Sequence, residues 1–202
     1  FERTMERMEE DPLLGNLSGK LFERKADGSL WEERTGDENA VGPVKFYRTE
    51  CFKAIGGFVR EVSWDGLDGH ICRMQCWIAQ SVDDPVMRII QLRPMGSSQQ
   101  NIVVGRVRWG RGKYFMGSAW YYVLASAVYR GMEPPYIIGG IALFWGYLRA
   151  SISGPQRYDN PAYRRYIRSF ERAQLLKGKK RALQEENDRV YAGRQLTSVQ
   201  ST

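Results

Sequence analysis

Histidine and cysteine are scarce in this chain of 202 residues, which has one histidine, His70, and three cysteines, Cys51, Cys72 and Cys76. A zinc site made of cysteine and histidine is therefore not expected. Cys72 and Cys76 are four residues apart and would share one face of a helix, but the odd number of thiols does not indicate a disulfide framework. We expect reduced, buried thiols, as in a cytosolic protein.

Long apolar runs and a secretory signal are also missing. The two apolar segments between Tyr114 and Leu148 are each shorter than the ~20 residues that one bilayer span requires. The opening residues, FERTMERMEEDP, form a charged amphipathic pattern without the basic and apolar regions of a signal peptide. Because the chain begins with Phe1 rather than methionine, we expect it to be a fragment of a longer protein.

Hydrophobic residues and positive charge are plentiful. The hydrophobic share of 43% is enough for a core, which argues against wholesale disorder. The formal net charge is +7 and the sequence pI is about 9.4. Such an excess suits nucleic acid, an anionic membrane or phosphorylated small molecules.

The hydrophobic patterns up to about residue 100 predict a mixed α/β or α+β domain. An Asp27-Gly28 pair between two strand patterns is a strong hairpin signal. Thr49 is expected to cap the helix that the glycine pair Gly56-Gly57 ends. The expected elements are a helix at 1–10, strands at 17–24, 29–34 and 44–48, a helix from 49, a helix from Asp65 or Asp68 to about Ala79, and a strand at 85–94.

Asp65 and Asp68 lie three residues apart at the start of a predicted helix. The structural interpretation is that an acid there caps free amides and complements the helix dipole. The functional interpretation is that paired carboxylates raise one another's pKa and supply a general base. Spacing alone leaves both interpretations open.

The order of residues around these acids resembles the inverting glycosyltransferases of family 2, which have the GT-A fold. The acidic motif of that family is Glu-Asp-x-Asp, and the matching positions here are Asp65, Gly66, Leu67 and Asp68. Gly66 stands where the family has the acid often assigned as base, so the base is open between Asp65 and Asp68, and we favour Asp65. The residues that carry the resemblance are Arg48, Phe52, Ile55, Gly56, Gly57, Phe58, Trp64, Asp65, Asp68 and Arg73.

The resemblance implies an in-line displacement at the anomeric carbon of a sugar. The acceptor hydroxyl is a weak nucleophile and needs a base within hydrogen-bond reach, a role for Asp65 with Asp68 as support or substitute. Gly56 and Gly57 would let the backbone pass close to the sugar, with Trp64 beside them. The alternative for the glycine pair is a simple helix stop.

A second resemblance lies in GRVRWGRG at 105–112, expected to be a loop. It is similar to the family's Gln-x-x-Arg-Trp motif, with Arg108, Trp109, Arg111 and Gly112 matching and Gly105 at the glutamine position. The resemblance implies that Arg108 and Arg111 bind the nucleotide diphosphate and that Trp109 stacks on the acceptor sugar. The alternative is an amphipathic basic loop on an anionic membrane. RPMGSS at 93–98 resembles the strand-end loop before this motif.

The family's metal motif, Asp-x-Asp, does not occur in the chain. FERTMERMEEDPLLGNLSGKL resembles the stretch that directly follows that motif, so a divalent metal, Mg or Mn, is expected outside this chain. The implied organisation is the C-terminal half of a GT-A domain at 1–112, an apolar membrane-associated helical hairpin at 113–150 and a basic helical tail at 151–202. Without the donor half, the chain alone is expected to be inactive.

The resemblance implies transfer of a sugar from a nucleotide-sugar donor to a glycan or lipid-linked acceptor, with inversion, in bacterial cell-envelope or extracellular polysaccharide synthesis. The hairpin and tail would hold the site at the cytoplasmic face of the cell membrane. No nucleic-acid partner is expected, because the basic residues are dispersed. Two alternatives stay open. One is a non-catalytic basic module that binds membrane or nucleic acid. The other is a degenerate transferase with only a scaffold role, which is suggested by Gly66 and Gly105 at the positions of the family's acid and glutamine.

Overall fold

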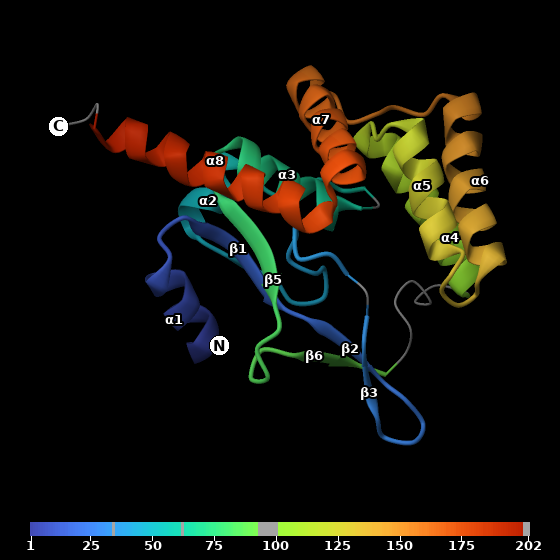
Figure 1. The fold of residues 1–202 in the computed structure, drawn as a ribbon, viewed down its shortest axis with the longest axis horizontal. Helices are drawn as coiled ribbons and strands as arrows, with labels where there is room; N and C mark the ends of the chain where they lie inside the picture. Colours follow the sequence, from blue (N-terminus) through green and yellow to red (C-terminus); the bar gives the residue numbers. More distant parts are fainter. Residues whose placement is uncertain (34, 62, 93–100, 200–202) are drawn as a thin grey trace. The chain divides into compact units, whose positions relative to one another are not determined.

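The computed structural model describes residues 1–33, 35–61, 63–92 and 101–199, and these form a mixed α/β structure, as the sequence predicts (Figure 1). They group into two compact units. The first unit comprises Phe1–Val59, Trp64–Leu92 and Gly178–Thr202, and the second comprises Arg60–Ser63 and Arg93–Lys177. These units do not follow the expected divisions at residues 112 and 150.

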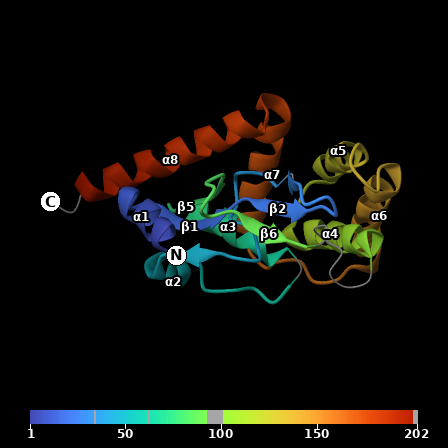
Figure 2. The same ribbon diagram turned by 90° about the horizontal axis from the view of Figure 1, so that it is seen from below.

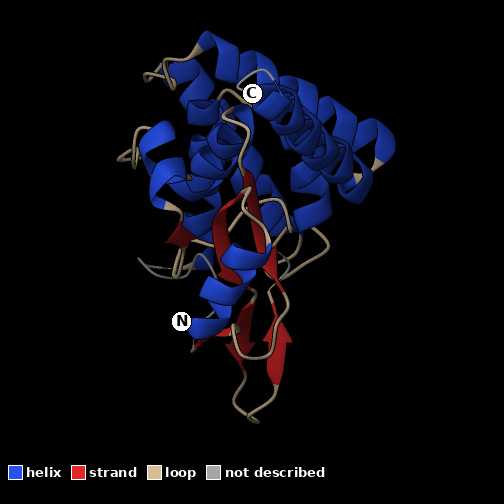
Figure 3. Ribbon diagram, turned by 90° about the vertical axis from the view of Figure 1, so that its left-hand side faces the viewer, coloured by secondary structure: helices blue, strands red, loops and turns tan. Residues whose placement is uncertain are grey.

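The described strands all belong to the first unit and form two small mixed sheets (red in Figure 3). In each sheet the central strand has one antiparallel and one parallel neighbour, with orders β4-β1-β5 and β3-β2-β6. The strands are β1 (Leu14–Gly19), β2 (Leu21–Arg24), β3 (Leu30–Glu32), β4 (Phe46–Tyr47), β5 (Ile78–Val82) and β6 (Ile89–Gln91).

The hairpin predicted from Asp27-Gly28 is confirmed. Arg24 of β2 pairs with Leu30 of β3, and Gly28 has a φ of +84°, which suits glycine. The Asp27 carboxylate accepts hydrogen bonds from the Ser29 amide at 2.9 Å and from its hydroxyl at 2.6 Å. The turn therefore follows from local side-chain chemistry.

Two predicted helix boundaries in the first unit are wrong. Helix α2 (Thr49–Ala54) has Arg48 at its N-cap position, without a side-chain cap, so Thr49 is already helical. Helix α3 (Trp64–Met74) ends five residues before Ala79. A turn with Cys76 at a φ of +57° follows, and the next residues form β5, because they pair with β1 in the sheet.

Two further helices complete the first unit, α1 (Glu2–Glu10), as predicted, and α8 (Lys179–Val199). Val190 of α8 is 1% exposed and packs in the core beneath β1 and β5. The Tyr191 hydroxyl donates to the Asp11 carboxylate at 2.6 Å. The core residues are Met8, Leu14, Leu17, Ile78 and Val190.

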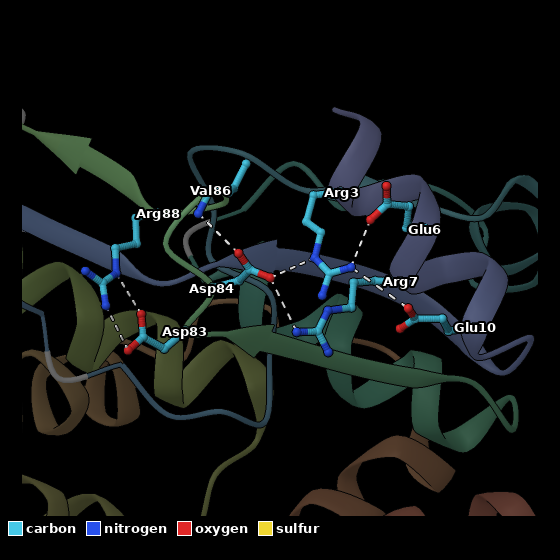
Figure 4. A network of polar contacts seen from close by, with 8 residues as sticks. All are labelled: Arg3, Glu6, Arg7, Glu10, Asp83, Asp84, Val86 and Arg88. Atoms are coloured by element: carbon cyan, nitrogen blue, oxygen red, sulfur yellow. Dashed lines mark hydrogen bonds and ion pairs between the residues drawn. The ribbon is translucent and has the colours of Figure 1, made fainter.

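A network of ion pairs holds α1 to the connection between β5 and β6 (Figure 4). The Asp84 carboxylate accepts hydrogen bonds from Arg3 Nε at 2.9 Å, Arg7 Nη2 at 3.4 Å and the Val86 amide at 3.1 Å. Hydrogen bonds from Arg3 and the Val86 amide lower the pKa of Asp84 below its ordinary value. The network thus fixes the N-terminal helix onto the sheet end.

The second unit is helical in its described part, with α6 packed against both α4 and α5 (Figures 1 and 2). Its helices are α4 (Ile102–Met116), α5 (Trp120–Arg130), α6 (Ile137–Ser153) and α7 (Pro161–Lys177). Among the helices in the described ranges, none combines the length and apolar character of a membrane span.

The expectation of a loop at 105–112 is wrong, because this segment lies inside α4. Asn101 caps the start of the helix, because its side chain accepts a hydrogen bond from the Val104 amide at 2.9 Å. Its glycines serve close packing: a Cβ added at Gly110 would lie 2.0 Å from the Leu143 carbonyl oxygen of α6. A glycine-rich pattern is typical of a loop, but in this chain the glycines allow close packing between two helices.

Candidate functional site

The glycine pair and the acids come together at the join of α2 and α3. Gly56 and Gly57 have φ values of +77° and +78°, and the Gly57 amide donates to the Phe52 carbonyl at 3.2 Å, so the predicted helix stop is confirmed. Asp65 lies in the first turn of α3 and Asp68 one turn on. The two acids have different surroundings.

Asp68 is buried in an ion pair. Lys45 Nζ donates to both of its carboxylate oxygens, at 2.8 and 2.9 Å, and the Tyr47 hydroxyl also donates to it. The two charged side chains are 3% and 5% exposed. Lys45 Nζ further donates to the Asp65 carbonyl at 2.7 Å, so one ammonium group organises the first turn of α3.

The ionisation of this cluster is set mainly by burial. Burial raises the pKa of Asp68 above its ordinary value, and the charge and hydrogen bonds of Lys45 and Tyr47 oppose that rise. Burial, with the neighbouring Asp68 carboxylate, also raises the pKa of the Tyr47 hydroxyl. Because both of its oxygens are engaged, Asp68 is poorly placed to receive a proton from a substrate.

Asp65 is only partly buried. Its Oδ1 accepts a hydrogen bond from the neighbouring Gly66 amide at 3.1 Å. Its Oδ2 faces Gly42, where an added Cβ would lie 3.1 Å from that oxygen. Among the residues that the structure describes, no side chain donates a hydrogen bond to Asp65, which leaves its carboxylate able to accept one.

An aromatic cluster adjoins the acids. The rings of Tyr47, Phe52, Phe58 and Trp64 meet edge to face, with centroids 5.0 Å apart for Phe52 and Phe58 and 4.9 Å apart for Phe58 and Trp64. Phe58 is 55% exposed, so the cluster reaches the surface of the first unit. Lys45 Nζ lies 4.9 Å from the Trp64 ring centroid, a cation–π contact that ties the cluster to the ion pair.

Two arginines that carry the family resemblance, Arg48 and Arg73, bind backbone carbonyls within the fold. Arg73 is 1% exposed and donates to the Gly69 carbonyl at 3.2 Å and to the Ala79 carbonyl, joining α3 to β5. Arg48 donates to the carbonyls of Met8 and Leu14. His70, which lies in α3, is buried.

Arg108, Trp109 and Arg111 lie in the second unit, on α4. Arg108 and Arg111, three residues apart, share a helix face, and Arg111 Nη2 is 3.4 Å from Glu61 Oε2. Trp109 is partly buried and packs against the core of the unit. The guanidinium of Arg106 lies 4.3 Å from its ring centroid, so a sugar on that ring face would have to displace it.

The acids of this cluster are not arranged as a metal site. Within the described ranges, no group of three or more histidine, cysteine, aspartate or glutamate side chains is placed to hold a metal ion. Both Asp68 oxygens already accept hydrogen bonds from an ammonium group. The 93–98 segment that resembles the loop before the Arg-Trp motif lies outside the described residues.

Lys45 and Tyr47 are the site residues that the sequence reasoning missed. They are two residues apart in the predicted strand at 44–48, so they share one side of it. Lys45 meets Asp68 across 23 residues of sequence, so no local pattern gave a signal for this pairing.

Comparison with known proteins found no match among protein families, curated proteins or solved structures. The distinguishing feature of the acid cluster is the contrast between Asp65 and Asp68, since Asp65 is partly exposed and the Asp68 carboxylate is neutralised by Lys45.

Proposed function

We propose that this chain belongs to an inverting glycosyltransferase of the family 2 type, that it forms the acceptor-side half of a GT-A domain, and that Asp65 is the general base. The observation that carries the proposal is the partly exposed Asp65 carboxylate beside an Asp68 neutralised by Lys45. Lys45 engages both oxygens of Asp68, whereas no side chain among the described residues donates a hydrogen bond to Asp65. The carboxylate of Asp65 can then accept a proton from an approaching hydroxyl.

The proposed step is a single displacement. The proton of the acceptor hydroxyl passes to an Asp65 oxygen while the hydroxyl oxygen forms a bond to the anomeric carbon. The bond from that carbon to the nucleotide diphosphate breaks, and the diphosphate leaves with the electron pair, which inverts the centre. Phe58 and Trp64 offer apolar ring surface to a sugar, and Arg108 and Arg111 are proposed to bind the diphosphate.

The proposed setting is bacterial polysaccharide synthesis at the cytoplasmic face of the membrane. The donor is a nucleotide-sugar and the acceptor a glycan or lipid-linked glycan. A divalent metal, Mg or Mn, would belong to the donor half, and no residue described here is assigned to it. The sequence resemblance supports this setting, and the accessible Asp65 is compatible with it.

The test uses the protein made from the complete reading frame that contains this chain. Asp65→Asn keeps the size of the side chain and removes its basicity, so sugar transfer should fall by about 10²–10⁴-fold. Binding of the nucleotide-sugar should stay within about twofold, because the proposed diphosphate contacts are elsewhere. The matched control is Asp83→Asn, an exposed aspartate of the first unit that pairs with Arg88.

Two results would remove the proposal. Normal turnover by the Asp65→Asn protein excludes Asp65 as the base. A complete reading frame that encodes no apolar strand ending in Asp-x-Asp upstream of Phe1 would leave no donor half for the reaction.

A further inference from the structure

Leu143 and Tyr147 of α6 are buried in the core of the second unit, but the helix also carries large apolar residues on its outside. These residues recur at intervals of three and four, which places them on one face, and each is between 39% and 77% exposed. We define this outer α6 face as Ile137, Ile141, Trp145, Leu148 and Ile152. In a water-soluble protein, the large apolar residues of a helix normally face the core and polar residues face the solvent.

The inward face of α6 is made mainly of small residues. Ala142, Gly146 and Ala150 repeat every fourth position and are buried, and a Cβ at Gly146 would lie 2.0 Å from the Val107 carbonyl oxygen of α4. Small residues at helix contacts with large ones facing outward are typical of proteins surrounded by lipid.

The turn between α5 and α6 extends this apolar surface. Val128, Met132, Tyr136 and Ile138 are each at least 60% exposed and lie within eleven residues of sequence around that turn. On α5, Trp120 and Leu124 are also exposed, two turns and one turn before Val128 respectively, on the same face. Exposed apolar residues therefore lie along both helices of the pair.

The segment that carries this surface is mainly positive in charge. Residues 101–158 contain seven arginines and lysines and one acid, Glu133, which is paired with Arg130 at 2.6 Å. Arg149 is exposed and lies one turn from Trp145 and from Ile152, at the edge of the outer α6 face. A second copy of the chain would bring the same positive charge to the interface, whereas anionic headgroups complement it.

We infer that the outer α6 face, with the α5–α6 turn, inserts into the surface of an anionic lipid bilayer, with α6 lying in the plane of the interface. The face runs from Ile137 to Ile152, about 22 Å along the helix axis. Exposed Trp120, Tyr136 and Trp145 have rings that favour the headgroup level. This inference does not rest on the proposed transfer reaction, and its test measures binding only.

The test is co-sedimentation of the whole chain with vesicles. With equal parts of phosphatidylcholine and phosphatidylglycerol, the chain should bind, and binding should weaken as salt rises. The double variant Ile141→Ser/Trp145→Ser should bind about tenfold less or weaker still, because two apolar anchors are lost. Both side chains are exposed, so circular dichroism should stay unchanged.

A matched control removes exposed apolar residues elsewhere. Val86→Ser/Leu176→Ser changes side chains that are 80% and 78% exposed and lie outside the outer α6 face, so binding should stay within about twofold. Arg149→Glu should weaken binding to the anionic vesicles and leave the weaker binding to pure phosphatidylcholine unchanged.

Two outcomes would overturn the inference. One is that the chain stays in the supernatant with anionic vesicles at low salt. The other is a stable dimer in light scattering that Ile141→Ser/Trp145→Ser dissociates, together with equal vesicle binding by that variant and the parent chain. The face would then be covered by a second copy.

Discussion

Lys45 is the residue on which the candidate site depends most. Its ammonium group reaches both oxygens of Asp68 and the Asp65 carbonyl, and its side chain is 3% exposed. A buried charge is tolerated only when a partner compensates for the water that it has lost. The engaged state of Asp68 therefore depends on this one lysine, which also holds the backbone carbonyl of Asp65.

We expect Lys45→Met to lower the free energy of unfolding of the first unit by about 3–5 kcal/mol, because the Asp68 carboxylate stays buried without its cation. Urea unfolding followed by circular dichroism measures the change. Lys53→Met, at an exposed position of α2, should alter that free energy by less than about 0.5 kcal/mol. Equal losses in the two variants would contradict a stabilising role for the buried pair.

Lys45→Met should also change how the free energy of unfolding depends on pH. Burial raises the pKa of Asp68 above its ordinary value of 3.8, so the folded state holds this proton more tightly than the unfolded state. Asp68 therefore contributes most to the stability of the folded state at pH values below its ordinary pKa. This contribution is lost as the pH rises through the raised pKa of the folded state. Lys45→Met raises that pKa further, so its loss of stability should be larger at neutral pH than at acidic pH.

Asp68→Asn in the Lys45→Met background is the matching control. The amide has no charge to desolvate, so the added pH dependence should disappear. A difference between parent and variant that is constant from acidic to neutral pH would show that Asp68 is not the group responsible.

At the scale of elements, the contact between α4 and α6 depends on two glycines. Gly110 lies against the Leu143 carbonyl and Gly146 against the Val107 carbonyl, and an added Cβ would come within 2.0 Å of either oxygen. Alanine stabilises an isolated helix over glycine by about 1 kcal/mol, so propensity alone predicts a gain at both positions. The backbone of the partner helix leaves no room for the added methyl group, so this gain is not expected in the folded protein.

We expect Gly110→Ala and Gly146→Ala each to lower the free energy of unfolding of the second unit by about 1–3 kcal/mol, because the methyl group forces the helices apart. Thermal or urea unfolding measures the loss. Gly193→Ala on α8 is the comparison, since its Cβ would meet the Cys76 sulfur at an ordinary 3.7 Å. A gain in stability at Gly146 would contradict the close packing.

At the scale of the whole molecule, the chain runs between two compact units more than once. Residues Arg60–Ser63 group with the second unit although Trp64 groups with the first, and Gly178 separates α7 of the second unit from α8 of the first. Each unit has its own buried cluster, around Leu17 in the first and around Leu143 in the second. Separate cores allow separate unfolding.

We therefore expect hydrogen exchange measured by mass spectrometry to report two stabilities. Lys45→Met should speed exchange in β1, β4 and α3 and leave α4 and α6 unchanged, whereas Gly146→Ala should do the reverse. Acceleration of exchange throughout the chain by either substitution would show that the units unfold as one.

Features set by neighbouring residues were determined by the sequence itself. The Asp27-Gly28 hairpin, the helix stop at Gly56 and Gly57 and the acids at the start of α3 follow from turn chemistry and helix ends, which act over a few residues. The apolar segments between Tyr114 and Leu148 were likewise expected to be helical, and α5 and α6 lie there, although the sequence did not predict which helices they pack against.

Only the tertiary structure decided what depends on distant residues. Ile78 and Ala79 leave the predicted helix because β1 offers them a parallel partner, and the glycines of 105–112 lie in a helix because α6 packs against them. Lys45 meets Asp68 across 23 residues of sequence, a pairing that no local pattern contains. The sequence placed two acids at one helix start, and the fold distinguished them by burying one beside a lysine and leaving the other accessible.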